Sequence, residues 1–181
     1  MKIVPTKIPE VLQIKPQVFN DERGFFFESY NQQKFCQTLG IKPNFVQDNH
    51  SYSRSHVLRG LHYQVKQPQG KLVRVISGKI FDVVLDIRKS SLNFGQWVGC
   101  YIRASNKEQV WIPAGFAHGF LVLSQTAEVI YKTTTFYAPQ YERTILWNDQ
   151  DLRIEWPIAS TPILSAKDQA GQTFRTAEVF L

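Results

Sequence analysis

The chain has 181 residues, 43% of them hydrophobic and 20% charged, which excludes a disordered protein and favours one globular domain over residues 1–181. Its net charge of +6 favours an anionic ligand, but the Lys and Arg residues are dispersed and form no nucleic-acid-binding motif. A phosphorylated small molecule is therefore a better candidate ligand than nucleic acid.

Other bulk features argue against a membrane or secreted protein. No apolar run approaches the length of a membrane span, and the N-terminal residues lack the long apolar segment of a secretion signal. The spacing of Cys36 and Cys100 matches no paired motif, and both thiols are expected to be reduced in the core. These features predict a cytoplasmic protein with no membrane partner.

The N-terminal part of the chain is predicted to hold an arm, a turn and a short helix. Prolines exclude a helix interior from residues 3–18, which are expected to lie as an edge or irregular strand over a sheet edge or a partner subunit. A turn at 21–24 and a strand at 25–30 follow. Asn31 can then cap a helix that Gly40 ends.

The centre of the chain is predicted to consist of strands. A strand is expected at residues 45–50, and a polar, basic loop at 51–56. Residues 71–76 and 79–87 flank the two-residue turn Ser77-Gly78, which predicts a β-hairpin. Further strands are expected at 96–103, 109–112, 120–124 and 127–136.

The second strand of that predicted hairpin alternates in polarity. Its apolar residues are separated by Asp82 and Asp86, which is the pattern of a sheet fully buried on one side. Short strands with almost no helical pattern between them predict an all-β fold, an antiparallel sandwich or barrel.

The stretch from Val57 to Gln64 holds the first candidates for chemistry. Gly60 and Leu61 separate Arg59 from His62, so a bend at Gly60 could bring both side chains to one cavity. A permanent cation beside a titratable imidazole suits an anionic ligand whose protons move near neutral pH.

A metal site is a weaker prediction. Ile112 to His118 contains Pro-x-Gly-x-x-His, which resembles the second signature of the cupin β-barrels, where the His is often a metal ligand. The His-x-His pair of the first signature is missing, because His62 is followed by Tyr63 and Gln64. The residues therefore favour a cupin barrel with no metal and no cofactor.

Proton transfer is the chemistry that these residues suit better. His62 is the best general base, and such a base is usually oriented by a carboxylate. Asp168 is one candidate for that carboxylate, and Asp82 and Asp86 are the alternatives. Tyr131 could be a general acid if its phenol points into the barrel, and is otherwise a half-buried strand residue.

Seven blocks, in order along nearly the whole chain, resemble the dTDP-4-dehydrorhamnose 3,5-epimerases. The blocks are Phe19–Tyr30, Phe45–Ser51, Val57–His62, Gly70–Arg74, Phe94–Trp97, Trp111–Phe120 and Ser165–Asp168. The resemblance implies a cupin, or jelly-roll, β-barrel of antiparallel strands with a few short peripheral helices. The segment 65–69 departs most from the family patterns.

The resemblance also implies a reaction without a cofactor. The substrate would be dTDP-4-dehydro-6-deoxy-D-glucose, a dTDP-linked 4-keto-6-deoxy sugar whose ketone acidifies the protons on C3 and C5, and the product would be dTDP-4-dehydro-L-rhamnose. By the family pattern His62 is the base and Asp168 polarises it. Lys71 steadies the enolate oxygen, and Tyr131 returns a proton from the opposite face.

Ligand contacts are implied in the same way. Arg23 and Arg59 resemble diphosphate contacts, for which a guanidinium is well shaped. The other implied substrate-binding residues are Glu28, Gln47, Asn49, Lys71, His118, Glu142 and Lys167. In the family the N-terminal arm crosses to a second subunit, so Arg23 and Glu28 are expected to serve the partner's site in a homodimer.

Three alternatives remain open on the sequence. The chain could invert C3 alone, or be a ketoisomerase on a similar dTDP-sugar. It could be a non-catalytic cupin that only binds a nucleotide sugar, although simple binding needs no base, acid or lysine. It could also be a metal-dependent cupin oxygenase.

Overall fold

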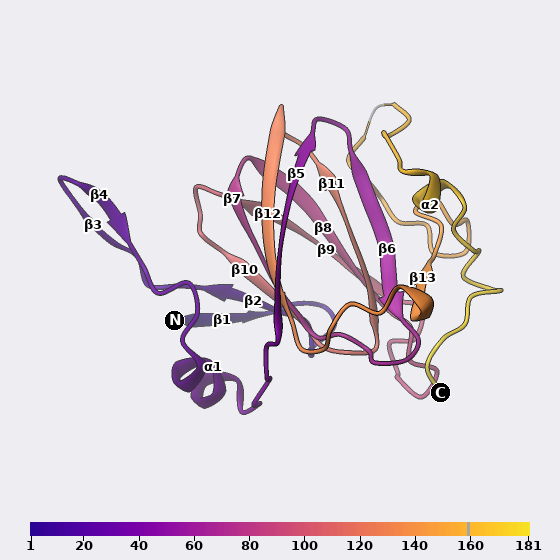
Figure 1. Ribbon diagram of the computed structural model, residues 1–181, viewed down its shortest axis with the longest axis horizontal. Helices are drawn as coiled ribbons and strands as arrows, with labels where there is room; N and C mark the ends of the chain where they lie inside the picture. The colour runs from indigo at the N-terminus through magenta and orange to yellow at the C-terminus, as the bar shows by residue number, and fades with distance from the viewer. Residues whose placement is uncertain (159) are drawn as a thin grey trace.

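Two antiparallel β-sheets packed face to face form the body of the protein, in a computed structural model that describes residues 1–158 and 160–181 (Figure 1). The six-stranded sheet has the order β1 (Lys2–Pro5), β2 (Leu12–Lys15), β10 (Gln109–Ile112), β7 (Lys71–Ser77), β12 (Thr126–Thr133) and β5 (Gln47–Arg54). The five-stranded sheet has the order β13 (Glu142–Thr144), β6 (Leu58–Gln64), β11 (Phe116–Val122), β8 (Lys79–Asp86) and β9 (Trp97–Arg103). This architecture confirms the predicted all-β, antiparallel fold.

The core between the sheets is built from alternate residues of the facing strands. Val73 and Val75 of β7, Val129 of β12, and Ile80 and Val84 of β8 belong to this cluster. Side chains at every second position share one face of a strand, so each strand contributes a row to the interior. The same rows end in polar residues at one mouth of the barrel, where the candidate site lies.

The five-stranded sheet is buried on both faces, and the prediction of one-sided burial was wrong. Phe81, Val83 and Leu85 of β8 lie on its outer face under the C-terminal segment, against residues such as Leu152 and Trp156. In Figure 1 the C-terminal segment runs along this side of the sandwich. Apolar residues of this segment, which has little regular secondary structure, cover the outer face of the sheet. The alternation within the strand does not predict that cover.

The predicted hairpin of residues 71–76 and 79–87 was also wrong in its pairing. Both strands exist, but β7 pairs with β10 and β12, whereas β8 pairs with β9 and β11. Gly78 lies between them with a φ of +81°, and a Cβ there would meet the Thr126 carbonyl oxygen at 2.1 Å. The turn therefore carries the chain from one sheet to the other, packed closely against β12.

The predicted helix is confirmed as α1 (Gln32–Leu39). Asn31 accepts a hydrogen bond from the Lys34 amide at its N-terminus, and Gly40 adopts the left-handed conformation at its C-terminus. Phe35 of this helix is buried and packs against Trp111 on the outer face of the six-stranded sheet. The arm lies beside it, and of the residues 3–18 predicted as edge or irregular strand, β1 forms the sheet edge, whereas β2 pairs with both β1 and β10.

Two boundaries differ from the predictions. Residues 51–54 belong to strand β5, which pairs with β12 over its whole length, so the predicted loop at 51–56 was wrong over most of its length. Because β5 is an edge strand, its polar residues are tolerated there. The strand predicted at 25–30 is the shorter β4 (Gly24–Phe26).

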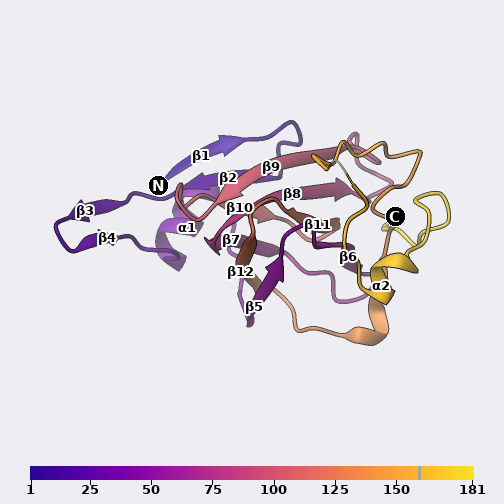
Figure 2. The same cartoon turned by 90° about the horizontal axis from the view of Figure 1, so that it is seen from above.

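A β-hairpin of β3 (Phe19–Asp21) and β4 projects away from the sandwich in both views (Figures 1 and 2). Phe19, Phe25 and Phe26 on it are more than half exposed. Across the described residues, no helix is long and apolar enough to cross a membrane. The hairpin thus presents apolar side chains that its own chain leaves largely uncovered.

Candidate active site

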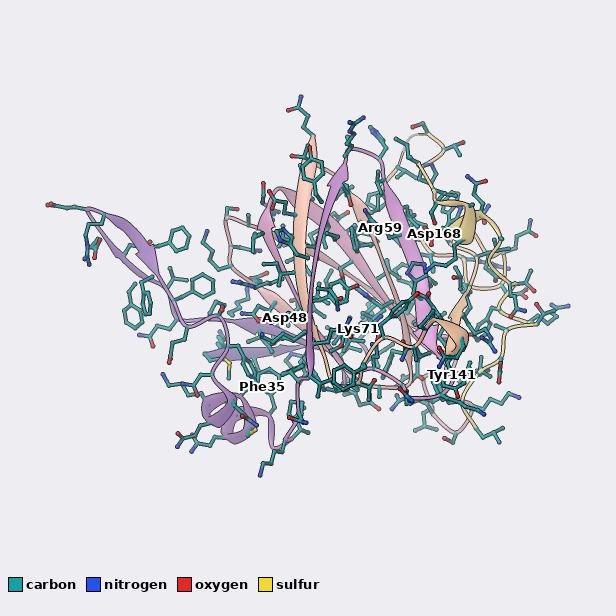
Figure 3. All side chains as sticks on the ribbon, viewed as in Figure 1. Phe35, Asp48, Arg59, Lys71, Tyr141 and Asp168 are labelled. Atoms are coloured by element: carbon teal, nitrogen blue, oxygen red, sulfur yellow. The ribbon has the colours of Figure 1, made fainter. Side chains whose placement is uncertain are left out.

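A cavity of about 310 Å³ opens at one mouth of the barrel, between the two sheets. It is lined from both sheets and from the C-terminal segment. Its lining residues are Gln47, Asn49, Ser51, Arg59, His62, Gln69, Lys71, His118, Gly119, Phe120, Tyr131, Tyr137, Glu142 and Lys167. In Figure 3, Arg59 and Asp168 lie close together by β6 and α2, and Lys71 lies nearer the middle of the sandwich.

A β-bulge brings Arg59 and His62 to the cavity together, as the sequence predicted. His62 pairs with His118 of β11 and Arg59 pairs with Phe120, so Gly60 and Leu61 both lie opposite Gly119. Gly60 has a φ of +116°, and a Cβ on it would lie 2.5 Å from the Gly119 Cα. Glycine at Gly60 and at Gly119 therefore lets the two backbones pass closely enough to form the bulge.

The carboxylate that orients His62 is Asp168. Its Oδ1 lies 2.5 Å from His62 Nε2 and also accepts a hydrogen bond from the Gly60 amide. Ser165 holds the other oxygen with a 2.6 Å hydrogen bond and caps α2 (Ala166–Gln169), from which Asp168 projects. Asp168 is only 2% exposed, so this geometry is held in the protein interior.

Neither of the alternative carboxylates reaches His62. Asp82 binds His118, with Oδ2 at 2.8 Å from Nε2. Asp86 is bound by the Arg88 guanidinium through two hydrogen bonds of 2.6 and 2.9 Å. The three candidates of the sequence therefore have three different partners.

Electrostatics favour a neutral His62 beside an ionised Asp168. Burial lowers the pKa of His62, while its hydrogen bond to Asp168 acts in the opposite direction without reversing the shift. Burial raises the pKa of Asp168, but its hydrogen bonds with His62 and Ser165 outweigh that effect and lower it to about 2. With Nε2–H donated to the carboxylate, Nδ1 carries the basic lone pair of His62.

Lys71 and Tyr131 enter the cavity from the opposite sheet. Burial lowers the pKa of Lys71 to about 8, against the raising effect of Glu142 and Asp82. Its Nζ lies 3.5 Å from the carbonyl oxygen of His62. Burial raises the pKa of Tyr131, so its phenol is protonated at neutral pH and can donate a proton. Tyr131 is thus a cavity residue, not only a packed strand residue.

Polar residues around the mouth form two smaller hydrogen-bonded groups. Gln47 Nε2 donates to Asn49 Oδ1 at 2.8 Å, along the inward face of β5. Glu142 accepts from Lys167 and from Tyr137, each at 2.7 Å. Arg59 donates from Nε to the Ser53 hydroxyl at 3.0 Å and from Nη2 to the Tyr52 carbonyl oxygen at 3.2 Å, and the residue is exposed at the rim.

Arg23 and Glu28 are the predicted binding residues that the chain does not bring to this cavity. Arg23 lies in the turn of the projecting hairpin with 90% of its side chain exposed, paired to Asp21. Glu28 is hydrogen-bonded to Asn31 and Lys34 beside α1. Both lie outside the set of cavity-lining residues of their own chain.

Besides the lining residues Gly119 and Phe120, four polar residues in or beside the cavity were not predicted as site residues from the sequence. Ser51, Gln69 and Tyr137 line the cavity, and Asp82 was considered only as a partner of His62. Ser51 lies in the predicted loop that is a strand, and Gln69 in the segment that departs from the family patterns. For Asp82, an acid within an apolar strand was the available signal.

The histidines do not gather into one site. His50 binds Glu128 on the sheet surface and His56 contacts the Ser55 hydroxyl, whereas only His62 and His118 line the cavity. Among residues 1–158 and 160–181, no three His, Cys, Asp or Glu side chains are grouped as metal ligands would be.

Comparisons with known proteins show the family of this chain. A family model described as dTDP-4-dehydrorhamnose 3,5-epimerase matches residues 5–176. The enzyme of that name from Pseudomonas aeruginosa is 57% identical over 99% of this chain and 99% of its own. A crystal structure of a Legionella pneumophila dTDP-6-deoxy-D-glucose-3,5-epimerase, in complex with dTDP-4-keto-L-rhamnose, is 48% identical with a TM-score of 0.95, covering 98% of this chain and 94% of that one.

A more distant structure has a narrower activity in its description. ChmJ of Streptomyces bikiniensis, a 3'-monoepimerase in complex with dTDP-quinovose, is 32% identical with a TM-score of 0.89, covering 95% of this chain and 87% of that one. The family match spans nearly the whole chain, as do the relatives of much higher identity. The chain therefore belongs to the dTDP-4-dehydrorhamnose 3,5-epimerase family, an isomerase family with a cupin-type β fold.

Proposed function

We propose that this chain epimerises C3 and C5 of dTDP-4-dehydro-6-deoxy-D-glucose and forms dTDP-4-dehydro-L-rhamnose. The observation that carries the proposal is the buried His62–Asp168 pair, in a cavity that Lys71 and Tyr131 enter from the facing sheet. A base, an acid and a cation thus surround one small volume. Epimerisation next to a ketone needs all three and no redox partner.

His62 is the proposed base. The C4 ketone acidifies the hydrogens on C3 and C5, because the electron pair left by either proton delocalises onto the carbonyl oxygen. Nδ1 of His62 takes the proton, and the resulting imidazolium is stabilised by the ionised Asp168 at 2.5 Å. The lowered pKa of His62 keeps the ring unprotonated, and so ready to accept a proton, at neutral pH.

Lys71 and Tyr131 complete the proposed cycle. The enolate carries its negative charge on the C4 oxygen, and a buried ammonium stabilises that charge more strongly than one in water. Tyr131 donates its phenolic proton to the opposite face of the carbon, which inverts the centre. Bulk solvent then reprotonates the phenolate and accepts the proton held by His62, so the net reaction moves no electrons.

Substrate binding is proposed for the polar residues of the rim. Arg59, which is exposed at the rim and anchored through Ser53, contacts the diphosphate. Gln47 and Asn49 contact the nucleotide, and the remaining contacts come from His118, Glu142 and Lys167. This assignment is supported by their common location around the cavity.

Arg23 and Glu28 are proposed to act in the cavity of a second copy. A homodimer that exchanges N-terminal arms would bring the projecting β3–β4 hairpin to the partner's site. Two observations support the proposal. Phe19, Phe25 and Phe26 are exposed, and among the described residues the Arg23 side chain forms hydrogen bonds only with Asp21 of its own hairpin. Exchange would cover these apolar rings and add a cation to the diphosphate site.

A cytoplasmic location is proposed as well. Cys36 and Cys100 are free thiols, and Cys100 is buried between the sheets. Unpaired cysteines are common in reducing compartments. Subcellular fractionation with an antibody against the protein tests this location.

Deuterium wash-in tests the reaction. The protein is incubated with the dTDP-4-keto sugar in deuterium oxide, and mass and proton spectra follow C3 and C5. Deuterium at both carbons is expected, and no incorporation at either would refute catalysis. In His62→Ala, incorporation should collapse while dTDP binding persists; incorporation at the wild-type rate would refute the role of His62.

The second candidate is a 3-epimerase. It is favoured by the likeness of this fold to ChmJ, which shows that the framework can accompany inversion at one centre. The same experiment separates the two, because a 3-epimerase incorporates deuterium at C3 alone. A metal-dependent reaction is tested by elemental analysis of the purified protein.

A further inference from the structure

A second imidazole–carboxylate pair lies beside His62 and has no role in the proton transfers above. His118 Nε2 and Asp82 Oδ2 are 2.8 Å apart, and the two residues are 7% and 0% exposed. His118 of β11 pairs directly with His62 of β6 in the sheet register, and both line the cavity. Two neighbouring imidazoles thus have separate carboxylates, Asp168 from the C-terminal segment and Asp82 from β8.

Asp82 occupies a costly place for a carboxylate. Its neighbours on the inward face of β8 are Ile80 and Val84, both in the apolar core. Its Oδ1 is buried and has no hydrogen-bond partner among the described residues. An ionised carboxylate in such surroundings costs several kcal/mol unless nearby positive charge compensates it. The placement therefore calls for a reason beyond packing.

The chemistry of the imidazole supplies one reason. A carboxylate accepts hydrogen bonds and donates none, so the ring nitrogen of His118 that faces Asp82, Nε2, must carry a proton. Nδ1 is then the acceptor that remains for a ligand in the cavity. The substrate offers hydroxyl groups on its sugar ring, and a hydroxyl is a donor of the matching kind.

Lys71 supplies the second reason. The titratable groups that face it are Asp82 and Glu142, which raise its pKa, and Lys167, which lowers it; His62, His118 and Tyr131 line the same cavity. Removing the charge of Asp82 removes one of the two anions that hold the proton on this buried ammonium. Asp82 does not line the cavity, but it interacts with His118 and Lys71, which do.

We propose that Asp82 is a positioning residue of the epimerase: it holds His118 with the proton on Nε2, so that Nδ1 accepts a hydrogen bond from a sugar hydroxyl. The inference rests on the proposed epimerase function. It gives the two pairs different tasks, since Asp168 assists a base and Asp82 orients a binding group.

The test compares Asp82→Asn with Asp86→Asn in the full-length protein. Asp86 is also 0% exposed and on β8, but it binds Arg88 and not a cavity residue, so it controls for the loss of a buried carboxylate. Asp82→Asn should lower kcat for deuterium wash-in about 100-fold, because an amide can also donate and thus support the wrong tautomer. Its alkaline limb should move to lower pH, and its dTDP affinity should match wild type.

Asp86→Asn should keep the wild-type kcat and alkaline limb. A folded Asp82→Asn with wild-type kcat and an unmoved alkaline limb would overturn the proposal. If Asp82→Asn does not fold, as a thermal melt would reveal, the tautomer is measured in the wild-type protein by ¹⁵N NMR of labelled histidine, with His118→Gln to assign the signals. A proton on Nε2 of His118 is expected, and a neutral ring protonated on Nδ1 would overturn the proposal.

The two hypotheses fail separately. If wild type incorporates no deuterium, the proposed function fails, whereas the tautomer of His118 can still be read. If wild type incorporates deuterium and Asp82→Asn does so equally well, only the role of Asp82 fails.

Discussion

Replacing Gly60 by alanine should damage both the stability and the site, because one glycine carries the bulge that aims Arg59 and His62 at the cavity. Its φ of +116° is strained for any residue with a Cβ, at a cost of about 1–2 kcal/mol. The new Cβ would also lie 2.5 Å from the Gly119 Cα, which is backbone and cannot rotate away. Forcing the strands apart adds about 1–3 kcal/mol, by analogy with overpacked cores.

The two costs together come to about 3 kcal/mol. For a chain of this size each kcal/mol lowers Tm by about 2–4 °C, so Gly60→Ala should melt roughly 6–12 °C below wild type. A shift of β6 at Gly60 would also move the side chains of Arg59 and His62 in the cavity. The rate of deuterium wash-in should therefore fall about 100-fold even in the folded variant. Scanning calorimetry and wash-in below the melting range measure the two effects.

Gly24→Ala is the matched control for stability. Gly24 has a similar φ of +125°, but a Cβ there would meet nothing within 4 Å. The control therefore carries the backbone strain of about 1–2 kcal/mol without the collision, and its loss of Tm should be about half that of Gly60→Ala. If Gly60→Ala melted within about 2 °C of wild type and kept its wash-in rate, the close passage of β6 over β11 would not be what shapes the site.

Three further outcomes are expected. Tyr131→Phe loses the phenolic proton but keeps the ring, so proton abstraction should persist while formation of product with an inverted centre falls about 100-fold. Inversion at the wild-type rate, measured by analysis of the product, would refute Tyr131 as the acid. The rate should fall at acid pH as His62 gains a proton, and at alkaline pH near 8 as Lys71 loses one. A rate that did not change between pH 5 and pH 10 would contradict both assignments. If arms are exchanged, an equimolar mixture of His62→Ala and Arg23→Ala chains, reassembled from monomers, should regain about a quarter of wild-type activity. The reason is that half of the dimers are mixed and each mixed dimer holds one intact site. Activity no greater than the mean of the separate variants would argue against exchange.

The local features of this protein could be predicted from its amino-acid sequence. Asn31 and Gly40 set the ends of α1 because capping involves only neighbouring residues. Short strands with almost no helical pattern between them predicted an antiparallel β fold, since parallel strands need long crossover connections. Gly60 between Arg59 and His62 predicted the bend that brings both to the cavity. The ordered motifs identified the family, and their residues named most of the cavity lining.

Which distant segments meet could not be predicted from the sequence and depends on the whole fold. Asp168 was one of three acids that suited His62, and the path of the C-terminal segment, 106 residues later, selects it. Strands β7 and β8 are adjacent in sequence yet lie in different sheets, because strand pattern specifies a face and not a partner. The same limit hid the outer cover of β8 and the attachment of Asp82 to His118. Periodicity and capping are local, whereas pairing, burial and the charge around each side chain depend on residues brought together by the whole fold.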